Sequence, residues 1–97
     1  MKIKFLFRKN LKMSPGKLAA QVSHVSANLA AKNQDVANEY NSNFLVTHVV
    51  LGVSDKKFNE KIQELRENQD ATWYVQKDAG FTELKPGTKT VLGYLKH

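Results

Sequence analysis

The chain has 97 residues, carries a net charge of +6, is 41% hydrophobic and 25% charged, and contains no cysteine. This length suits one domain over residues 1–97, and the composition is that of a folded globular protein rather than a disordered or fibrous one. The lack of cysteine excludes a disulfide framework, thiolate metal ligands and a cysteine nucleophile. No apolar segment is long enough for a signal-peptide core or a membrane span, so we expect a cytoplasmic protein with no membrane partner.

The positive charge is unevenly distributed along the chain. Residues 1–34 contain seven Lys or Arg side chains and no acidic one, whereas residues 35–72 contain seven acidic side chains and four basic ones. A basic segment of this kind is typical of a surface that binds nucleic acid or an anionic membrane, and a scattered, solvated surface is the alternative.

The apolar residues and turn formers predict four strands and three helices. In chain order they are a strand over 3–8, a helix over 15–32, a short helix over 35–41, a strand over 44–53, a helix after residue 54, a strand over 72–77 and a strand over 88–95. Ser14 is a suitable N-cap and Pro15 a suitable first residue for the first helix, and Ser54 is a suitable cap for the third. The β-branched and apolar residues of 44–53 predict a strand that is buried on both faces, in the middle of the sheet.

The lengths of the connections predict the directions of the strands. Long crossovers that contain helices favour parallel neighbours, and the short connection before the last strand could join an antiparallel pair. We therefore expect an α/β fold with a mixed, mostly parallel four-stranded sheet and helices packed on it.

One polar row runs along the first long helix. At about 100° per residue, Lys17, Gln21, His24 and Asn28 fall within a narrow stripe flanked by apolar residues, which favours a row that faces a cleft wall or a partner. A boundary stripe half in water is the alternative. Lys17 stands in the first turn, where a cation opposes the helix dipole by about 0.3–1 kcal/mol, so a bound anion would explain it better than helix stability does.

Charged residues outside this helix are further candidates. Lys9 and Lys12 precede the helix and could extend the anion site, although loop lysines are often only solvated. Asp78 directly follows a predicted strand, at the kind of strand end where α/β sheets hold their ligands. An Asx turn, in which its carboxylate bonds backbone N–H groups around Gly80, is the alternative. The histidines lack the spacing of metal ligands, so we expect neither a metal nor another cofactor.

Separated blocks of the sequence resemble the type 2 peptidyl-tRNA hydrolases. They are residues 8–13 (RKNLKM), 16–24 (GKLAAQVSH), 78–82 (DAGFT) and 86–93 (PGTKTVLG), which occur in the order expected for that family. The resemblance spans nearly the whole chain. It implies a three-layer α/β/α protein that cleaves the ester between a peptide and the 3′ ribose of tRNA, and it leaves room for a homodimer.

The resemblance also implies which residues serve the reaction. The family's functional positions fall on Lys17, Gln21, His24, Asp78, Thr82 and Thr90. Two positions depart from the family pattern, since Asn10 stands where an aspartate is usual and Phe81 replaces a common arginine.

Ester hydrolysis needs an activated water and stabilisation of the carbonyl oxygen as it gains charge. Our hypothesis is that Asp78 orients and partly deprotonates the water with the help of Thr82, while Lys17 stabilises the oxyanion or binds the terminal phosphate. Gln21 and His24 would bind the 3′ adenosine or pass a proton to the leaving oxygen, although His24 could instead be a buried structural residue.

Arg8, Lys9 and Lys12 would hold the acceptor stem of peptidyl-tRNA through its phosphates. The alternatives are a nonenzymatic RNA-binding module on the same fold and a protein-interaction domain with an incidental basic face.

Overall fold

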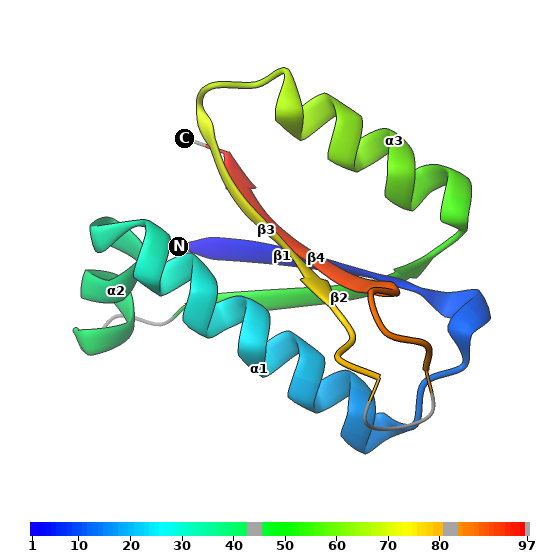
Figure 1. Ribbon diagram of the computed structural model, residues 1–97. Coiled ribbons are helices and arrows are strands. Elements are labelled where there is room, and N and C mark those ends of the chain that lie inside the picture. The colour runs from blue at the N-terminus through cyan, green and yellow to red at the C-terminus, as the bar shows by residue number, and fades with distance from the viewer. Residues whose placement is uncertain (43–45, 81–83, 97) are drawn as a thin grey trace.

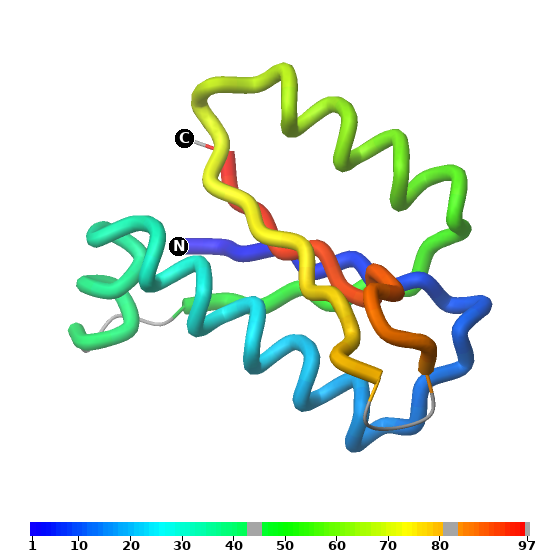
Figure 2. Tube along the Cα trace, viewed as in Figure 1, coloured from blue at the N-terminus to red at the C-terminus, as the bar shows by residue number. Residues whose placement is uncertain are grey.

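The protein is represented by a computed structural model that describes residues 1–42, 46–80 and 84–96 (Figure 1). In chain order the elements are β1 (Lys2–Arg8), a 3-10 turn η1 (Lys9–Leu11), α1 (Pro15–Lys32), α2 (Gln34–Asn41), β2 (Thr47–Val53), α3 (Asp55–Arg66), β3 (Ala71–Lys77) and β4 (Lys89–Lys96). Figure 2 follows the same path along the Cα trace. The predicted helices and strands are therefore confirmed, except that β2 begins at Thr47 and that residues 44–45 of the predicted strand lie outside the described residues.

The two long helices begin where their caps predict. The Ser14 hydroxyl oxygen accepts a hydrogen bond of 3.2 Å from the Lys17 N–H at the start of α1. The Ser54 hydroxyl oxygen accepts one of 3.2 Å from the Lys57 N–H at the start of α3. Each bond satisfies a backbone donor that has no partner within its helix.

The four strands form one mixed sheet in the order β2-β1-β4-β3. Among neighbouring strands, only β1 and β2 pair in parallel, whereas β4 pairs in antiparallel fashion with both β1 and β3. The expectation of a mostly parallel sheet is therefore wrong. The helical crossovers do keep β1, β2 and β3 in one direction, but β4 inserts between β1 and β3 and replaces a parallel contact with two antiparallel ones.

The predicted place of the second strand in the sheet is also wrong. β2 is an edge strand, and its side chains are exposed or half-buried, with Val50 41% and Leu51 48% exposed. Its β-branched, apolar sequence resembles that of a buried strand, which is why composition placed it in the centre. The most buried strand is β4, which lies between β1 and β3.

The sheet is covered on both faces, which makes the protein a three-layer α/β/α fold. α1 and α2 lie on one face and α3 on the other (Figure 1). On the first face the buried residues are Ile3, Phe5, Val25, Leu29, Val36, Val91 and Leu95. On the second they are Leu6, Phe58, Ile62, Leu65, Leu92 and Tyr94.

α1 approaches β4 closely at Gly93. A Cβ atom on Gly93 would overlap Val25 Cγ1 and lie 3.2 Å from both Leu29 Cδ1 and Phe5 Cδ1. This glycine lets the helix lie close to the sheet, and so brings the side chains of α1 into contact with the ends of β3 and β4.

None of the helices in the described part of the chain has both the length and the apolar character of a transmembrane helix.

Candidate active site

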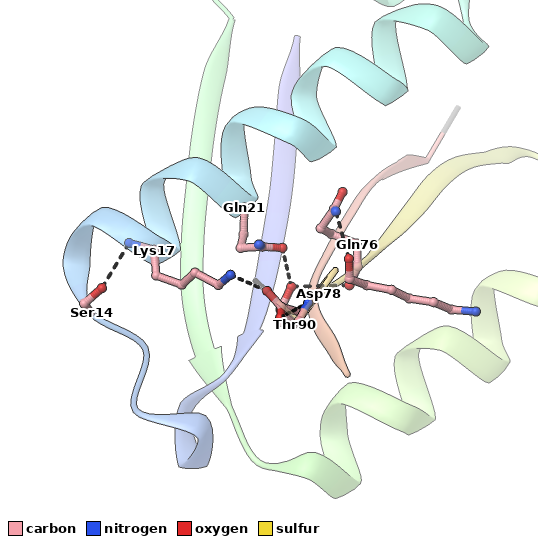
Figure 3. Close-up of polar contacts among 8 residues, drawn as sticks. Ser14, Lys17, Gln21, Gln76, Asp78 and Thr90 are labelled. Carbon is pink, nitrogen blue, oxygen red and sulfur yellow. Dashed lines mark hydrogen bonds and ion pairs between the residues drawn. The ribbon is translucent and has the colours of Figure 1, made fainter. Parts of the chain in front are cut away.

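Lys17 and Asp78 meet at the end of the molecule where α1 begins and β3 ends (Figure 3). The backbone of Asp78 is fixed by the segment before β4, because its N–H donates to Thr88 O at 2.8 Å and its carbonyl accepts from the Gly87 N–H at 2.7 Å. The side chain of Lys17 extends from the first turn of α1 to the Asp78 carboxylate. The two charged groups singled out in the sequence thus share one place.

The Asx turn at Asp78 is confirmed, and the same carboxylate also contacts Lys17. Its Oδ1 atom contacts the Lys17 ammonium, and its Oδ2 atom accepts a hydrogen bond of 2.8 Å from the Gly80 N–H, as in an Asx turn. The side chain of Asp78 is 1% exposed and that of Lys17 is 12% exposed. The Lys17 side chain is therefore the more exposed member of the pair.

The surroundings of Asp78 keep it ionised. The Lys17 ammonium lowers the pKa of the Asp78 carboxyl below its ordinary value, and the Gly80 N–H adds to this effect against the opposing effect of burial. An ionised carboxylate with a lowered pKa is a weak base. It is nevertheless well suited to holding an ammonium in place and to orienting a neighbouring dipole.

A buried polar pair lies beside these charges. The Thr90 hydroxyl donates to Gln21 Oε1 at 2.7 Å, and the carbonyl of Gln76 lies 3.3 Å from the same hydroxyl (Figure 3). Thr90 is fully buried and Gln21 is 5% exposed. Because the hydroxyl contacts the amide oxygen, it fixes the orientation of the whole Gln21 amide group.

The polar row on α1 faces the sheet only over its first half. Lys17 and Gln21 point inward, whereas His24 is exposed and Asn28 is half-buried, with its amide donating to the His24 carbonyl at 2.8 Å. The alternative of a buried structural histidine at position 24 is therefore wrong.

Arg8 is engaged in a contact that sequence reasoning missed. Its guanidinium donates to Asp55 Oδ1 at 2.8 Å and to Asp55 Oδ2 at 3.2 Å, and also to the Lys89 carbonyl at 3.0 Å. The amide of Asn10 donates to Asp55 Oδ2 at 2.9 Å. Arg8 thus joins the end of β1 to the first turn of α3 and the start of β4, and Asn10 takes part in the same cluster. The sequence signal for this contact was Asp55, an acidic residue in the first turn of α3. Its presence there was equally explained by the helix dipole, which favours acidic residues in a first turn.

Four further lysines belong to the segments that lead into α1 and β4. Lys9 and Lys12 lie on the exposed turn between β1 and α1, and Lys85 and Lys89 lie before and at the start of β4. Within residues 1–42, 46–80 and 84–96, none of these four ammonium groups contacts a carboxylate at 4 Å or less. Lys85 and Lys89 were not singled out in the sequence, although they flank the Pro86-Gly87 turn.

Two residues named in the sequence analysis, Thr82 and Phe81, lie outside the described residues. Over the part of the chain that is described, no group of three or more His, Asp or Glu side chains is arranged to hold a metal ion.

The chain matches the family model described as peptidyl-tRNA hydrolase PTH2 over residues 1–95. It is similar to the peptidyl-tRNA hydrolase of Methanopyrus kandleri, with 42% identity over 88 residues that cover 89% of this chain and 76% of that protein. It is also similar to the peptidyl-tRNA hydrolase of Thermoplasma acidophilum, with 32% identity over 90 residues, 89% of this chain and 76% of that protein. The peptidyl-tRNA hydrolase of Halobacterium salinarum is 37% identical over 86 residues, which cover 88% of this chain and 76% of that protein.

Proposed function

The chain belongs to the PTH2 family of peptidyl-tRNA hydrolases, and on this premise we propose that it hydrolyses the ester bond of peptidyl-tRNA. In this reaction water adds to the ester carbonyl carbon, the bond to the ribose oxygen breaks, and the peptide acid and free tRNA are released. The observation that carries the proposal is the contact between Lys17 and Asp78, which are 61 positions apart in the sequence and meet beside the buried Gln21–Thr90 pair.

Lys17 is the group that would face the reacting carbonyl. Its ammonium is held by Asp78, and its side chain is the more exposed of the two, so Lys17 is the better placed to contact a substrate oxygen. As the carbonyl oxygen gains negative charge, a fixed ammonium stabilises it without reorganising. Removal of one such donor typically lowers the rate by about 10²- to 10³-fold, or about 2.7–4 kcal/mol.

Asp78 would hold Lys17 and orient the attacking water, with Thr82 as a second partner for that water. Its lowered pKa suits this division of roles, because the carboxylate stays negative while the proton is only partly transferred in the transition state. On departure the ribose oxygen takes up a proton from the solvent or from a nearby donor.

Gln21 and His24 would bind the 3′ end of the tRNA, and the buried Thr90 would serve this binding by orienting Gln21. The Thr90 hydroxyl occupies the amide oxygen of Gln21, which leaves the amide nitrogen as the donor for the substrate. His24 lies one turn further along α1, exposed and able to contact the terminal adenosine.

The acceptor stem would be held by Lys9 and Lys12, together with Lys85 and Lys89. These lysines make no ion pair with a described residue, which suits contacts with phosphates, whose strength falls as salt rises. The guanidinium of Arg8 already donates to Asp55 and to Lys89, so Arg8 would support the phosphate contacts by fixing the turn that carries Lys9. An enzyme with this substrate would act in the cytoplasm.

A homodimer would form most simply along β2. One edge of this strand pairs with β1, and the other has no strand beside it among the described residues. The strand has no charged side chain, and Val50 and Leu51 are exposed, so it lacks the usual protection against pairing with another strand. Light scattering of the parent and of Val50→Lys would test this, since the substitution should leave only monomers.

Turnover of peptidyl-tRNA by the parent, Lys17→Met and Asp78→Asn tests the hydrolase proposal, with Lys56→Met as a control on an exposed lysine of α3. We expect cleavage by the parent and the control, a loss of at least about 10²-fold in Lys17→Met, and retained RNA binding in both site variants. A parent that binds tRNA but cleaves no ester would refute the hydrolase and support the nonenzymatic module. Equal turnover in all four proteins would refute the assigned site.

A further inference from the structure

A second group of lysines lies at the start of β1, on the face of the sheet that α3 covers and opposite to the face with the Lys17 site. Lys2 and Lys4 belong to a strand in the interior of the sheet, and they share the face of Leu6, which packs against α3. Ile3 and Phe5 point to the other face, under α1. The inward side of an interior strand usually carries apolar residues, yet here two exposed lysines stand two positions apart.

These lysines line a cavity with two more. The cavity measures about 180 Å³ and is lined by Lys2, Lys4, Lys61, Tyr94, Leu95 and Lys96. Lys4 and Tyr94 are directly paired residues of β1 and β4, and the Lys61 ammonium lies 5.4 Å from the centre of the Tyr94 ring. The four lysines that line this cavity therefore come from three elements, β1, β4 and α3.

A single carboxylate contacts this group within the described residues. Glu64 Oε2 lies 2.7 Å from the Lys61 ammonium, and Glu64 Oε1 lies 2.8 Å from the Lys96 ammonium. The two cations lower the pKa of Glu64 to about 2, so it is ionised at neutral pH. Lys2 and Lys4 make no ion pair with any described residue, and the four lysines with one glutamate leave a net charge of +3 at the cavity.

The size and lining of the cavity select the ligand. A cavity of this volume is below the roughly 300–1,000 Å³ of a site for a drug-sized molecule, but it has room for a phosphate group. Tyr94 is only 7% exposed, so its ring offers no platform on which a base could stack. Lysine ammonium groups bind phosphate as point charges and need no particular orientation of the oxygens. The site thus suits a phosphate backbone rather than a base.

We propose that Lys2, Lys4, Lys61 and Lys96 form a second phosphate-binding site, which takes the backbone of RNA independently of the Lys17 site. The choice of RNA rests on the proposed function. Lys2 and Arg8 are at opposite ends of the seven-residue strand β1, about 20 Å apart at 3.3 Å per residue, and the Lys17 site lies at the Arg8 end on the other face. No single phosphate could bridge the two sites, so the second one would hold a different part of a tRNA or a second RNA strand.

The test is the salt dependence of binding to a short RNA hairpin that carries no ester. If Lys2 and Lys4 each neutralise one phosphate, the slope of log K against log salt should become shallower by about 1.4–1.8 in Lys2→Gln/Lys4→Gln, at 0.7–0.9 per phosphate. The matched control, Lys56→Gln/Arg66→Gln, removes the same charge from exposed positions of α3 outside the cavity, and its slope should change by less than half as much. The single variant Lys4→Gln should show half of this change in slope. It therefore still tests the site if the double variant fails to fold.

Other outcomes would overturn the site. Equal slopes for the double variant and its control would mean that only net charge matters. Tight binding to vesicles of phosphatidylserine, lost in the double variant, combined with an unchanged slope for RNA would assign the site to a membrane surface instead. If the parent cleaves no peptidyl-tRNA but the slopes differ as expected, the second site stands and only the hydrolase proposal fails.

Discussion

The hydrogen bond between Thr90 and Gln21 offers a test of how the site is held together. Thr90→Val keeps the shape of the side chain but removes the hydroxyl that donates to Gln21 Oε1 at 2.7 Å. Thr90 is fully buried and Gln21 nearly so, so the amide oxygen would be left without its donor. An unsatisfied buried polar group costs about 1–3 kcal/mol, and we expect the free energy of unfolding to fall by that amount.

A double-mutant cycle with Gln21→Leu separates this effect from packing. In Thr90→Val/Gln21→Leu neither polar group remains, so the double variant should be more stable than the sum of the single losses predicts, by about 1 kcal/mol or more. Urea unfolding followed by the fluorescence of the single tryptophan, Trp73, gives each free energy. Thr90→Ser retains the hydroxyl and is the control for the lost bond.

Two results would refute this reasoning. Single losses that add to within about 0.5 kcal/mol would show that the two side chains are not coupled. A Thr90→Val variant as stable as the parent would show that the Gln21 amide finds another partner. The bond can be tested through activity as well, since a Gln21 that it orients toward the substrate should be displaced in Thr90→Val. This variant should then have a lower kcat for peptidyl-tRNA than the parent, and Thr90→Ser should not. Both are measured at a urea concentration well below the unfolding transition, so that unfolding does not contribute.

Two further predictions concern the packing of α1 and the charges at its first turn. Gly93→Ala places a methyl group against Val25, and such overpacking should cost about 1–3 kcal/mol in urea unfolding, whereas Gly16→Ala, with open space around it, should cost nothing. Because Lys17 lowers the pKa of Asp78 below its ordinary 3.8, their ion pair stabilises the fold at pH values above about 4 and is lost as pH falls through the lowered pKa. Unfolding measured from pH 7 to pH 2 should therefore show a steeper acid loss in the parent than in Asp78→Asn, and parallel curves would contradict this.

The local structure of this protein was predictable because local rules determine it. The cap at Ser14, the proline after it and the apolar spacing of α3 each act within one or two turns of helix, and these helices begin where the rules place them. The order of the strands depends on which strands meet across the sheet, and that is not a local property. The sequence of β2 is as apolar as that of a central strand, but both later strands add on the other side of β1, and this leaves β2 at the edge.

The contact between Lys17 and Asp78 was predictable for a related reason. A cation in the first turn of α1 is not explained by the stability of that helix, and a carboxylate at a strand end commonly faces a ligand site. Each residue therefore indicated a partner outside its own helix or strand. The inward orientation of Gln21 also follows from its spacing to Lys17. The exposure of His24 depends on which side of the stripe faces the sheet, since α1 buries Gln21, Val25 and Leu29, and spacing alone does not determine this.

The cluster of Arg8, Asn10 and Asp55 shows that a residue which departs from a family pattern can be interpreted only when the residues it contacts are known. In the sequence, Asn10 stood only where an aspartate is usual. In the structure its amide donates to Asp55, whose pKa is lowered mainly by the hydrogen bond from Arg8 and further by that from Asn10. An aspartate at position 10 would place a second carboxylate beside Asp55, and like charges at that distance repel. Asparagine therefore suits this arrangement, in which its amide links the turn after β1 to the first turn of α3.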